Sequence, residues 1–284
     1  MTLKIAIQKS GRLFDESIDL LNKCGLKIRD SKGQLRAEIS GFDAEVLFLR
    51  NSDIPKYLED GVADLAIIGE NVLIEKGANV VVLEKLGFSS CRLSIATPKG
   101  MNYSDISSLE GKKIATSYPN TLQTFLDTNN VNADMHIISG SVEIAPNIGL
   151  ADGICDLVSS GSTLFKNGLV EQDVIIRSEA VLAANKTTVL EKSEEVNDIV
   201  YRVRSVLNAA DNKYILFNIP NSNIDEVSRI LPVLKSPTVV PLIEEGWSSI
   251  HTVINRKDFW KIINQLKQSG AEGILVLPVE NMII

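Results

Sequence analysis

Residues 143–164 read Glu-Ile-Ala-Pro-Asn-Ile-Gly-Leu-Ala-Asp-Gly-Ile-Cys-Asp-Leu-Val-Ser-Ser-Gly-Ser-Thr-Leu, and this stretch decides how the rest of the chain is interpreted. An apolar run at residues 154–158 is typical of a buried strand. The small residues after it, here named the Ser/Gly loop, are Ser159, Ser160, Gly161, Ser162 and Thr163. A helix that starts in such a loop would place backbone N–H groups and hydroxyls around an anion. The pattern predicts a phosphate site, with an ordinary Ser/Gly turn as the alternative.

Acidic residues upstream of the Ser/Gly loop strengthen the first interpretation. A phosphorylated sugar needs donors for its phosphate and carboxylates for its hydroxyls, often with Mg2+ bound nearby. We expect Glu143 and Asp152 to contact sugar hydroxyls or Mg2+, although Asp152 could instead cap a turn. Asp156 is open between a catalytic and a structural role.

An internal repeat predicts two similar α/β lobes. Residues 60–65 followed by Gly69 resemble residues 152–157 followed by Gly161, with an offset of 92 residues in both matches. The repeat pairs Asp152 with Asp60, and Asp156 with Asp64. Each half also has a Lys-Ile-Ala strand, at residues 4–6 and 113–115. This period is too long for a solenoid, so we expect two lobes that face one another across a cleft.

Ligands of open α/β sheets bind beyond the carboxyl ends of the strands. The loops expected there are residues 9–12, 69–71, 117–120 and 159–163. Two extended segments, residues 87–97 and 173–184, are expected to cross between the lobes as a two-strand hinge. A helix over residues 192–208 should follow, since it carries one apolar face and early acidic residues.

The last part of the chain has a different order of elements. From residue 213 the periodicity predicts strand, helix, strand, strand, helix and strand, with the first helix over residues 224–234. This βαββαβ order is typical of a ferredoxin-like module.

Composition limits the partners and the compartment. A net charge of −7 argues against nonspecific binding to nucleic acid or to an anionic membrane. No apolar run approaches the ~18 residues that cross a bilayer, and no signal-peptide pattern is visible. The three cysteines lack metal-ligand spacing, which indicates free thiols in a reducing compartment. The sequence therefore predicts a cytoplasmic protein.

The chain resembles the ATP phosphoribosyltransferase family over nearly its whole length. The family signature is matched by Glu143, Gly149, Ala151, Ile154, Asp156, Leu157, Ser160, Gly161, Thr163 and Leu164. Further similar segments are residues 8–13, 67–73, 91–94, 115–119 and 275–280. The length of 284 residues resembles the long form of the family, which carries a C-terminal regulatory domain.

The resemblance implies a fold and a division of the chain. It implies two lobes like those of type II periplasmic binding proteins, followed by an ACT-like ferredoxin-like domain. The expected domains are residues 1–90 with 180–208, residues 91–179, and residues 209–284.

The resemblance also implies a reaction, in which N1 of the ATP adenine displaces pyrophosphate from 5-phosphoribosyl 1-pyrophosphate with Mg2+ as cofactor. This would be the first step of histidine biosynthesis, and no covalent intermediate is required. The residues expected to act on the transferred group are Glu143, Asp152, Arg92 and Lys9, and the Ser/Gly loop would bind its phosphate. The residues expected around ATP are Gly11, Arg12, Glu70, Asn71 and Tyr118. Tyr118 would stack on adenine, or else only pack a turn.

Regulation and assembly are expected from the same resemblance. Histidine is expected to inhibit through the C-terminal module, with Asn218, Thr238 and Ala271 as contacts. We expect a homo-oligomer, dimeric or hexameric, without a separate regulatory subunit. The alternative is a two-lobed solute-binding protein, which the C-terminal module and the missing signal peptide disfavour.

Overall fold

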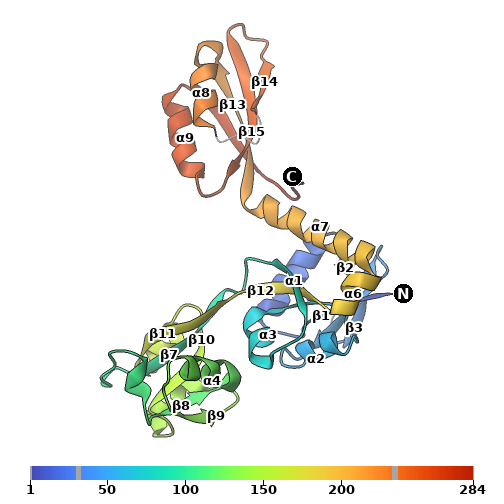
Figure 1. Ribbon diagram of the computed structural model, residues 1–284. Helices are drawn as coiled ribbons and strands as arrows, with labels where there is room; N and C mark the ends of the chain where they lie inside the picture. The colour runs from blue at the N-terminus through green and yellow to red at the C-terminus, as the bar shows by residue number, and fades with distance from the viewer. Residues whose placement is uncertain (1, 30–32, 232–235, 284) are drawn as a thin grey trace. The chain divides into compact units, whose positions relative to one another are not determined.

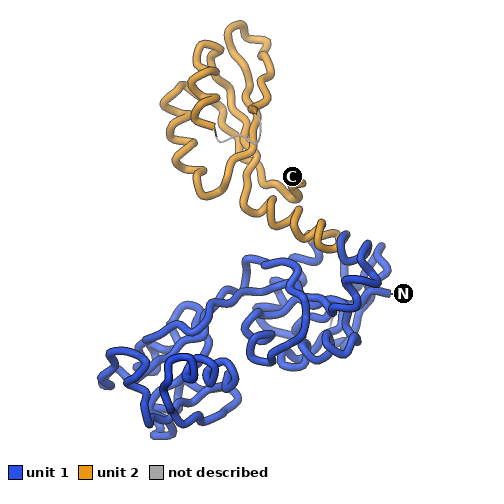
Figure 2. Tube along the Cα trace, in the orientation of Figure 1, with its two compact units in different colours: residues 1–22, 26–197 blue, residues 23–25, 198–284 orange. Residues whose placement is uncertain are grey.

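The computed structural model describes residues 2–29, 33–231 and 236–283 (Figure 1). It divides into two compact units, residues 1–22 with 26–197 and residues 23–25 with 198–284 (Figure 2). The predicted lobe II belongs to the first unit, together with most of the predicted lobe I, and the predicted C-terminal module belongs to the second. Residues 198–208, which were predicted as part of lobe I, lie in the second unit. Within the described residues, no helix is both long enough and apolar enough to cross a membrane.

Lobe I is a mixed sheet with its helices. The strand order is β2-β3-β4-β1-β5-β12-β6. The strands are β1 (Leu3–Gln8), β2 (Lys27–Ile28), β3 (Arg36–Ser40), β4 (Ala44–Leu49), β5 (Leu65–Gly69), β6 (Val81–Lys85) and β12 (Ala180–Ala184). The helices are α1 (Arg12–Lys23), α2 (Ile54–Glu59), α3 (Glu70–Lys76) and α6 (Lys186–Glu191). β1 runs parallel to β4 and β5, so the loops after these strands lie at one edge of the sheet.

Lobe II is a second sheet, with the order β11-β7-β10-β8-β9. Its strands are β7 (Cys91–Pro98), β8 (Lys113–Thr116), β9 (Asp134–Ile137), β10 (Gly153–Val158) and β11 (Leu169–Ser178). Its helices are α4 (Pro119–Thr128), α5 (Ser162–Lys166) and the short 3-10 helices η1 (Ile106–Leu109), η2 (Val142–Ile144) and η3 (Pro146–Ile148). β10 runs parallel to β8, so the Ser/Gly loop and residues 117–120 leave the sheet at the same edge.

The chain crosses between the lobes twice, as predicted from the two extended segments. The crossings lie side by side, because Leu86 N donates to Ala180 O at 2.9 Å and Ala180 N donates to Phe88 O at 3.0 Å. β12 then returns to lobe I, where every one of its residues is buried. Lobe I is therefore built from two separated parts of the chain.

Where β5 and β10 begin, the two lobes match in a different register from the one that the repeat predicts, although Gly69 and Gly161 both lie directly before a helix, at the predicted offset of 92 residues. Lys4 N donates to Asp64 Oδ2 at 2.8 Å, and Lys113 N donates to Asp152 Oδ2 at 2.8 Å. In each lobe the aspartate N–H donates back to the same lysine carbonyl. The counterpart of Asp152 is therefore Asp64, at an offset of 88 residues, and the predicted pairing with Asp60 is wrong. Asp60 instead follows α2 and forms an ion pair with Lys56.

The second unit contains the predicted ferredoxin-like module. α7 (Ser193–Ala210) precedes β13 (Asn212–Pro220), η4 (Asn221–Asn223), α8 (Ile224–Ile230), β14 (Thr238–Pro241), β15 (Trp247–Asn255), α9 (Phe259–Gln268) and β16 (Glu272–Pro278). The antiparallel sheet has the order β14-β15-β13-β16, and α8 and α9 lie together on one side of it (Figure 1). The apolar core includes Phe217, Ile250 and Leu266. Part of the helix predicted over residues 224–234 lies outside the described residues, and α8 ends at Ile230.

Candidate functional site

The Ser/Gly loop forms a small pocket at the end of β10. The strand ends at Val158, and α5 begins at Ser162. Gly161 has a φ of +77°, which a side chain with a Cβ rarely adopts, while a Cβ there would meet nothing within 4 Å. The pocket of about 90 Å3 is lined by Glu143 and residues 156–164. The structure thus places the carboxylates of Glu143 and Asp156 in the same pocket as the Ser/Gly loop.

Asp156 and Glu143 interact across this pocket. Burial raises the pKa of the Asp156 carboxyl, and the negative charge of Glu143 raises it further. The backbone N–H of Leu157, which donates to Asp156 Oδ1 at 2.8 Å, opposes this rise in pKa. Two adjacent carboxylates can accept hydrogen bonds from sugar hydroxyls or contribute ligands to Mg2+. Within the described residues, no cluster of three or more His, Cys, Asp or Glu forms a metal cage.

Asp152 lies at the opposite end of β10 from the Ser/Gly loop. Its carboxylate accepts the backbone N–H of Lys113 at 2.8 Å, at the start of β8. Residue 152 does not line the pocket that contains Glu143 and Asp156. Asp152 therefore binds a backbone N–H group, which agrees with the structural role that was the alternative to a catalytic one.

Arg92 reaches the Ser/Gly loop from β7. Its Nη1 donates to the carbonyl of Ser159 at 3.1 Å, and its Nε and Nη2 pair with the Glu171 carboxylate. Glu171 also accepts the Ser94 hydroxyl at 2.7 Å. The Arg92 hydrogen bond is the main cause that lowers the pKa of Glu171. Glu171 was missed by the sequence analysis, because nothing in its local sequence shows that it faces Arg92.

The loop after β1 carries the other predicted cations. Gly11 has a φ of +93° and precedes Arg12, whose Nε lies 3.3 Å from Glu16 Oε1. The Arg12 side chain is 66% exposed, and Lys9 is exposed as well. Burial raises the pKa of the Cys91 thiol, and the Arg12 charge opposes that rise. Arg12 therefore lies near Cys91, which is the first residue of β7 and directly precedes Arg92.

Glu70, Asn71 and Tyr118 lie where the lobes meet. Asn71 is 4% exposed, its Nδ2 donates to the Tyr118 hydroxyl at 3.4 Å, and its Oδ1 accepts from Ser178 Oγ at 3.0 Å. Gly69 leaves room for Asn71, because a Cβ at Gly69 would lie 2.5 Å from Asn71 Oδ1. Glu70 forms an ion pair of 3.4 Å with Lys85.

Tyr118 connects this group to the carboxylate pocket. Its ring packs against the core of lobe II. Burial raises the pKa of its hydroxyl well above the usual range, and the negative charge of Asp156 adds to the effect. The structure therefore brings predicted ATP residues of lobe I close to the carboxylates of lobe II.

The predicted histidine contacts lie in two different places. Asn218 of β13 and Thr238 of β14 lie on the sheet face opposite the helices, where His251 pairs with Thr238. His251 Nδ1 lies 2.9 Å from the Tyr214 hydroxyl. Ala271 is instead part of the core beneath α9. The structure thus brings two of the three predicted residues to one face.

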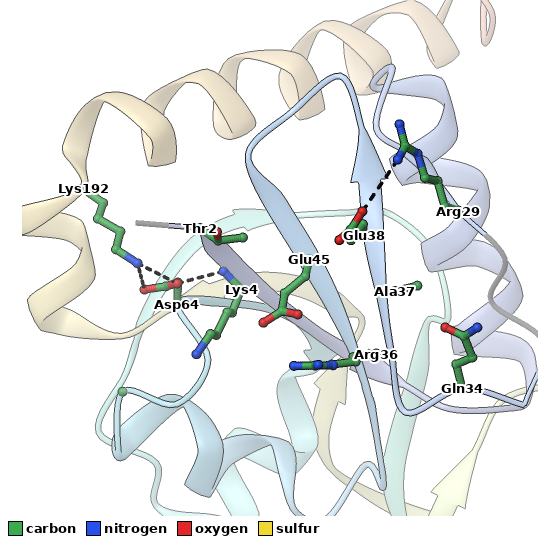
Figure 3. Close-up of a pocket in the computed structure, with 11 residues that line it drawn as sticks. Thr2, Lys4, Arg29, Gln34, Arg36, Ala37, Glu38, Glu45, Asp64 and Lys192 are labelled. Carbon is green, nitrogen blue, oxygen red and sulfur yellow. Dashed lines mark hydrogen bonds and ion pairs between the residues drawn. The ribbon is translucent and has the colours of Figure 1, made fainter.

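A larger cavity, of about 860 Å3, lies at the amino ends of β1 and β5 (Figure 3). Basic and acidic side chains alternate around it, and Lys192 Nζ lies 2.8 Å from Asp64 Oδ1. The predicted site residues are not among those that line it. Since this end of the sheet lies away from the Ser/Gly loop and its neighbours, we assign the Lys192–Asp64 pair a structural role.

Comparisons with known proteins agree over nearly the whole chain. The family model described as ATP phosphoribosyltransferase matches residues 50–205, and the model described as HisG, C-terminal domain matches residues 209–281. An ATP phosphoribosyltransferase of Cytophaga hutchinsonii is 53% identical over 281 residues, which are 99% of this chain and 98% of the relative. One of Bacteroides thetaiotaomicron is 51% identical over 282 residues, covering 99% of this chain and all of the relative.

Solved structures show the same likeness. A chain of the ATP phosphoribosyl transferase (HisG:HisZ) complex from Thermotoga maritima is 30% identical with a TM-score of 0.65, and 99% of it aligns with 73% of this chain. The substrate-binding protein of an amino acid ABC transporter is 13% identical, covers 74% of this chain and 95% of its own, and has a TM-score of 0.50. The likeness to the transporter protein concerns the two-lobed fold alone.

Proposed function

This chain belongs to the ATP phosphoribosyltransferase family, and from that premise we propose where its substrates bind and which residues promote the transfer. The family catalyses the first step of histidine biosynthesis, and the alternative of a solute-binding protein is not favoured. The residue roles below are our proposal.

The Ser/Gly loop binds the 5-phosphate of phosphoribosyl pyrophosphate. The positive φ of Gly161 turns the backbone between β10 and α5, so that successive N–H groups and the Ser160, Ser162 and Thr163 hydroxyls can surround one anion. Local donors are needed here because the chain as a whole is negatively charged.

Glu143 and Asp156 accept hydrogen bonds from the ribose hydroxyls. They line the pocket beside the Ser/Gly loop, and we assign Asp156 the role that the sequence analysis gave to Asp152. The same two carboxylates fit Mg2+, which commonly takes one or two carboxylates and completes its shell with water and substrate phosphates. When bound there, Mg2+ would neutralise charge on the departing pyrophosphate.

Arg92, Lys9 and Arg12 bind the pyrophosphate and the ATP triphosphate. Glu171 holds the Arg92 guanidinium next to the Ser159 carbonyl, so this cation is oriented before a substrate arrives. Lys9 and Arg12 are exposed on the loop after β1 and can turn toward a polyanion.

ATP is held between the lobes by Gly11, Glu70, Asn71 and Tyr118. The Asn71–Tyr118 hydrogen bond joins both lobes next to Asp156. Adenine N1 then attacks C1 of the ribose directly, and the enzyme promotes this step by orienting two anionic substrates and stabilising the leaving group.

The second unit senses histidine, with Asn218 and Thr238 on the open face of its sheet. The presence of this module supports an enzyme that needs no separate regulatory subunit. We also propose that the enzyme is a homodimer or homohexamer and that it acts in the cytoplasm. We propose residues 1–90 with 180–208 and residues 91–179 as the catalytic lobes, and residues 209–284 as the regulatory domain; the match of residues 209–281 to a separate family model supports the last boundary.

The observation that carries the residue roles is the single pocket shared by Glu143, Asp156 and the Ser/Gly loop. The test is pyrophosphate release from ATP and phosphoribosyl pyrophosphate by the purified chain, with and without Mg2+. We expect release that a chelator abolishes. Product formation that persists in excess chelator would exclude the proposed role of Mg2+.

A further inference from the structure

Glu75 is a buried carboxylate that the proposed mechanism does not use. It lies near the end of α3 in lobe I and is 6% exposed. Among the described residues it forms no ion pair with Lys, Arg or His. A carboxylate in this environment needs hydrogen-bond donors, because an unpaired buried charge is strongly unfavourable.

Within the described residues, the hydrogen-bond donors to the Glu75 carboxylate come from lobe II. Asn120 N donates to Glu75 Oε1 at 3.0 Å, while Thr121 N and Thr121 Oγ1 donate to Oε2 at 2.9 and 2.8 Å. Asn120 Nδ2 also donates to the Glu75 backbone carbonyl at 2.9 Å. We name Glu75, Asn120 and Thr121 the latch.

The latch caps α4 from outside its own lobe. The first N–H groups of a helix lack partners within the helix, and a residue just before the helix commonly supplies an acceptor. Tyr118 holds that position before α4, and its side chain makes no capping bond. The Glu75 carboxylate takes its place, and its negative charge suits the positive end of the helix dipole.

The position of the latch connects it to the reaction. α3 carries Glu70 and Asn71 at its start and Glu75 near its end, and Tyr118 immediately precedes α4. The latch and the Asn71–Tyr118 bond therefore link the same two helices at two points. A cavity of about 550 Å3 borders the latch and is lined by both lobes, so side-chain packing between the lobes is incomplete there. The hydrogen bonds of the latch therefore carry a larger share of the contact between the lobes.

We propose that Glu75 is a positioning residue that holds the two lobes in the arrangement that binds ATP. This inference rests on the proposed function, in which ATP lies between the lobes. Loss of the latch lowers the population of the competent arrangement, and a smaller competent fraction raises the apparent substrate dissociation constant in proportion. The chemical step is then little changed once substrate is bound.

The experiment compares Glu75→Gln and Glu75→Ala with Asp105→Asn as a matched control. Asp105 accepts the N–H of Ser107 at 2.9 Å and so caps a helix within lobe II alone. Hydrogen exchange with residue resolution, in the substrate-free full chain, reports the Asn120 and Thr121 amides directly. Steady-state kinetics on the same proteins give KM for ATP and kcat separately.

The amides of Asn120 and Thr121 should exchange faster in both Glu75 variants and remain protected in Asp105→Asn. KM for ATP should rise by about 10-fold to 100-fold, the range expected for lost charge-assisted hydrogen bonds, with a smaller change in kcat. The glutamine variant should be less affected than the alanine variant, because it keeps one acceptor oxygen. If a Glu75 variant does not fold, Thr121→Val removes only the hydroxyl donor and should raise KM more modestly.

Unchanged exchange of these two amides in Glu75→Ala would overturn the latch. Faster exchange with an unchanged KM would also overturn it, because Glu75 would then only cap a helix. If the wild-type chain turns over no substrate, the proposed function fails, while the exchange comparison still decides whether the latch exists.

Discussion

Asp156→Asn should reduce activity while it stabilises the fold, whereas Asp152→Ala should destabilise the fold and leave activity nearly unchanged. Asp156 lies in the pocket with Glu143 and the Ser/Gly loop, whereas Asp152 accepts the Lys113 N–H at the other end of β10. The two substitutions are a test of which carboxylate meets the substrate, since both residues belong to the same strand region.

The expected loss of activity follows from the bonds to ribose. A hydrogen bond to a charged group contributes about 1.5–3 kcal/mol, so Asp156→Asn should lower kcat/KM by roughly 10-fold to 150-fold. Asp152→Ala removes one partly solvated hydrogen bond, which costs about 1 kcal/mol of stability and lowers Tm by roughly 2–4 °C for a domain of this size. Its kcat/KM should remain near that of the wild type.

The stability of Asp156→Asn should depend on pH. Burial raises the pKa of Asp156 in the folded chain above its value in the unfolded chain. At neutral pH the ionised carboxylate therefore opposes folding, and this cost disappears as pH falls through the folded pKa toward the unfolded value of about 3.9. Asp156→Asn should thus raise Tm at pH 7, with a smaller gain near pH 4.

Thermal unfolding at both pH values and a pyrophosphate-release assay on the same preparations measure all of these quantities. Loss of activity in Asp152→Ala with full activity in Asp156→Asn would refute the assignment of the two carboxylates. A lower Tm of Asp156→Asn at pH 7 would show that the ionised carboxylate supports the fold and that the pKa argument is wrong.

Three further predictions concern other parts of the molecule. Gly161→Val should abolish binding of phosphoribosyl pyrophosphate in calorimetry, because valine disfavours a φ of +77°, whereas Thr163→Ala should weaken it by about 10-fold to 100-fold; normal affinity in Gly161→Val would place the phosphate elsewhere. Lys192→Met should destabilise the chain by about 3–5 kcal/mol in denaturant unfolding, since it removes the ion-pair partner of the buried Asp64 carboxylate, while Lys56→Met, which breaks only an exposed ion pair, should have a much smaller effect. Histidine should bind to the full chain with measurable heat that Asn218→Ala removes, and a chain ending at Ala210 should lose inhibition by histidine; full inhibition of the shortened chain would exclude a site in the second unit.

Local sequence patterns predicted much of the fold. The apolar run before the Ser/Gly loop became β10, and the βαββαβ order after residue 213 became the ferredoxin-like module. The two extended crossings were also predicted, because a long strand pattern is visible in consecutive residues. Within the signature, the Ser/Gly loop and the acidic residues before it already indicated a phosphorylated ligand, although the sequence favoured Glu143 and Asp152 as the carboxylates and left Asp156 open.

The register of the repeat could not be found in the same way. The Asp-Gly pair at residues 60–61 follows a helix, while the pair at residues 152–153 opens a strand, yet both look alike in sequence. The spatial equivalence of Asp64 and Asp152 became visible only through the backbone N–H groups that they accept.

The sequence by itself determined the order of the elements, the family and the loop that suits a phosphate, because these depend on neighbouring residues and their period. Tertiary structure alone decided that Asp156 rather than Asp152 faces Glu143, that Glu171 orients Arg92, and that Glu75 caps a helix of the other lobe. Glu75 and Thr121 are 46 residues apart, and Arg92 and Glu171 are 79 apart. Such partners meet because the sheets and the two crossings bring together residues that are far apart in the sequence. A local sequence pattern cannot predict which charged groups will then be buried next to one another.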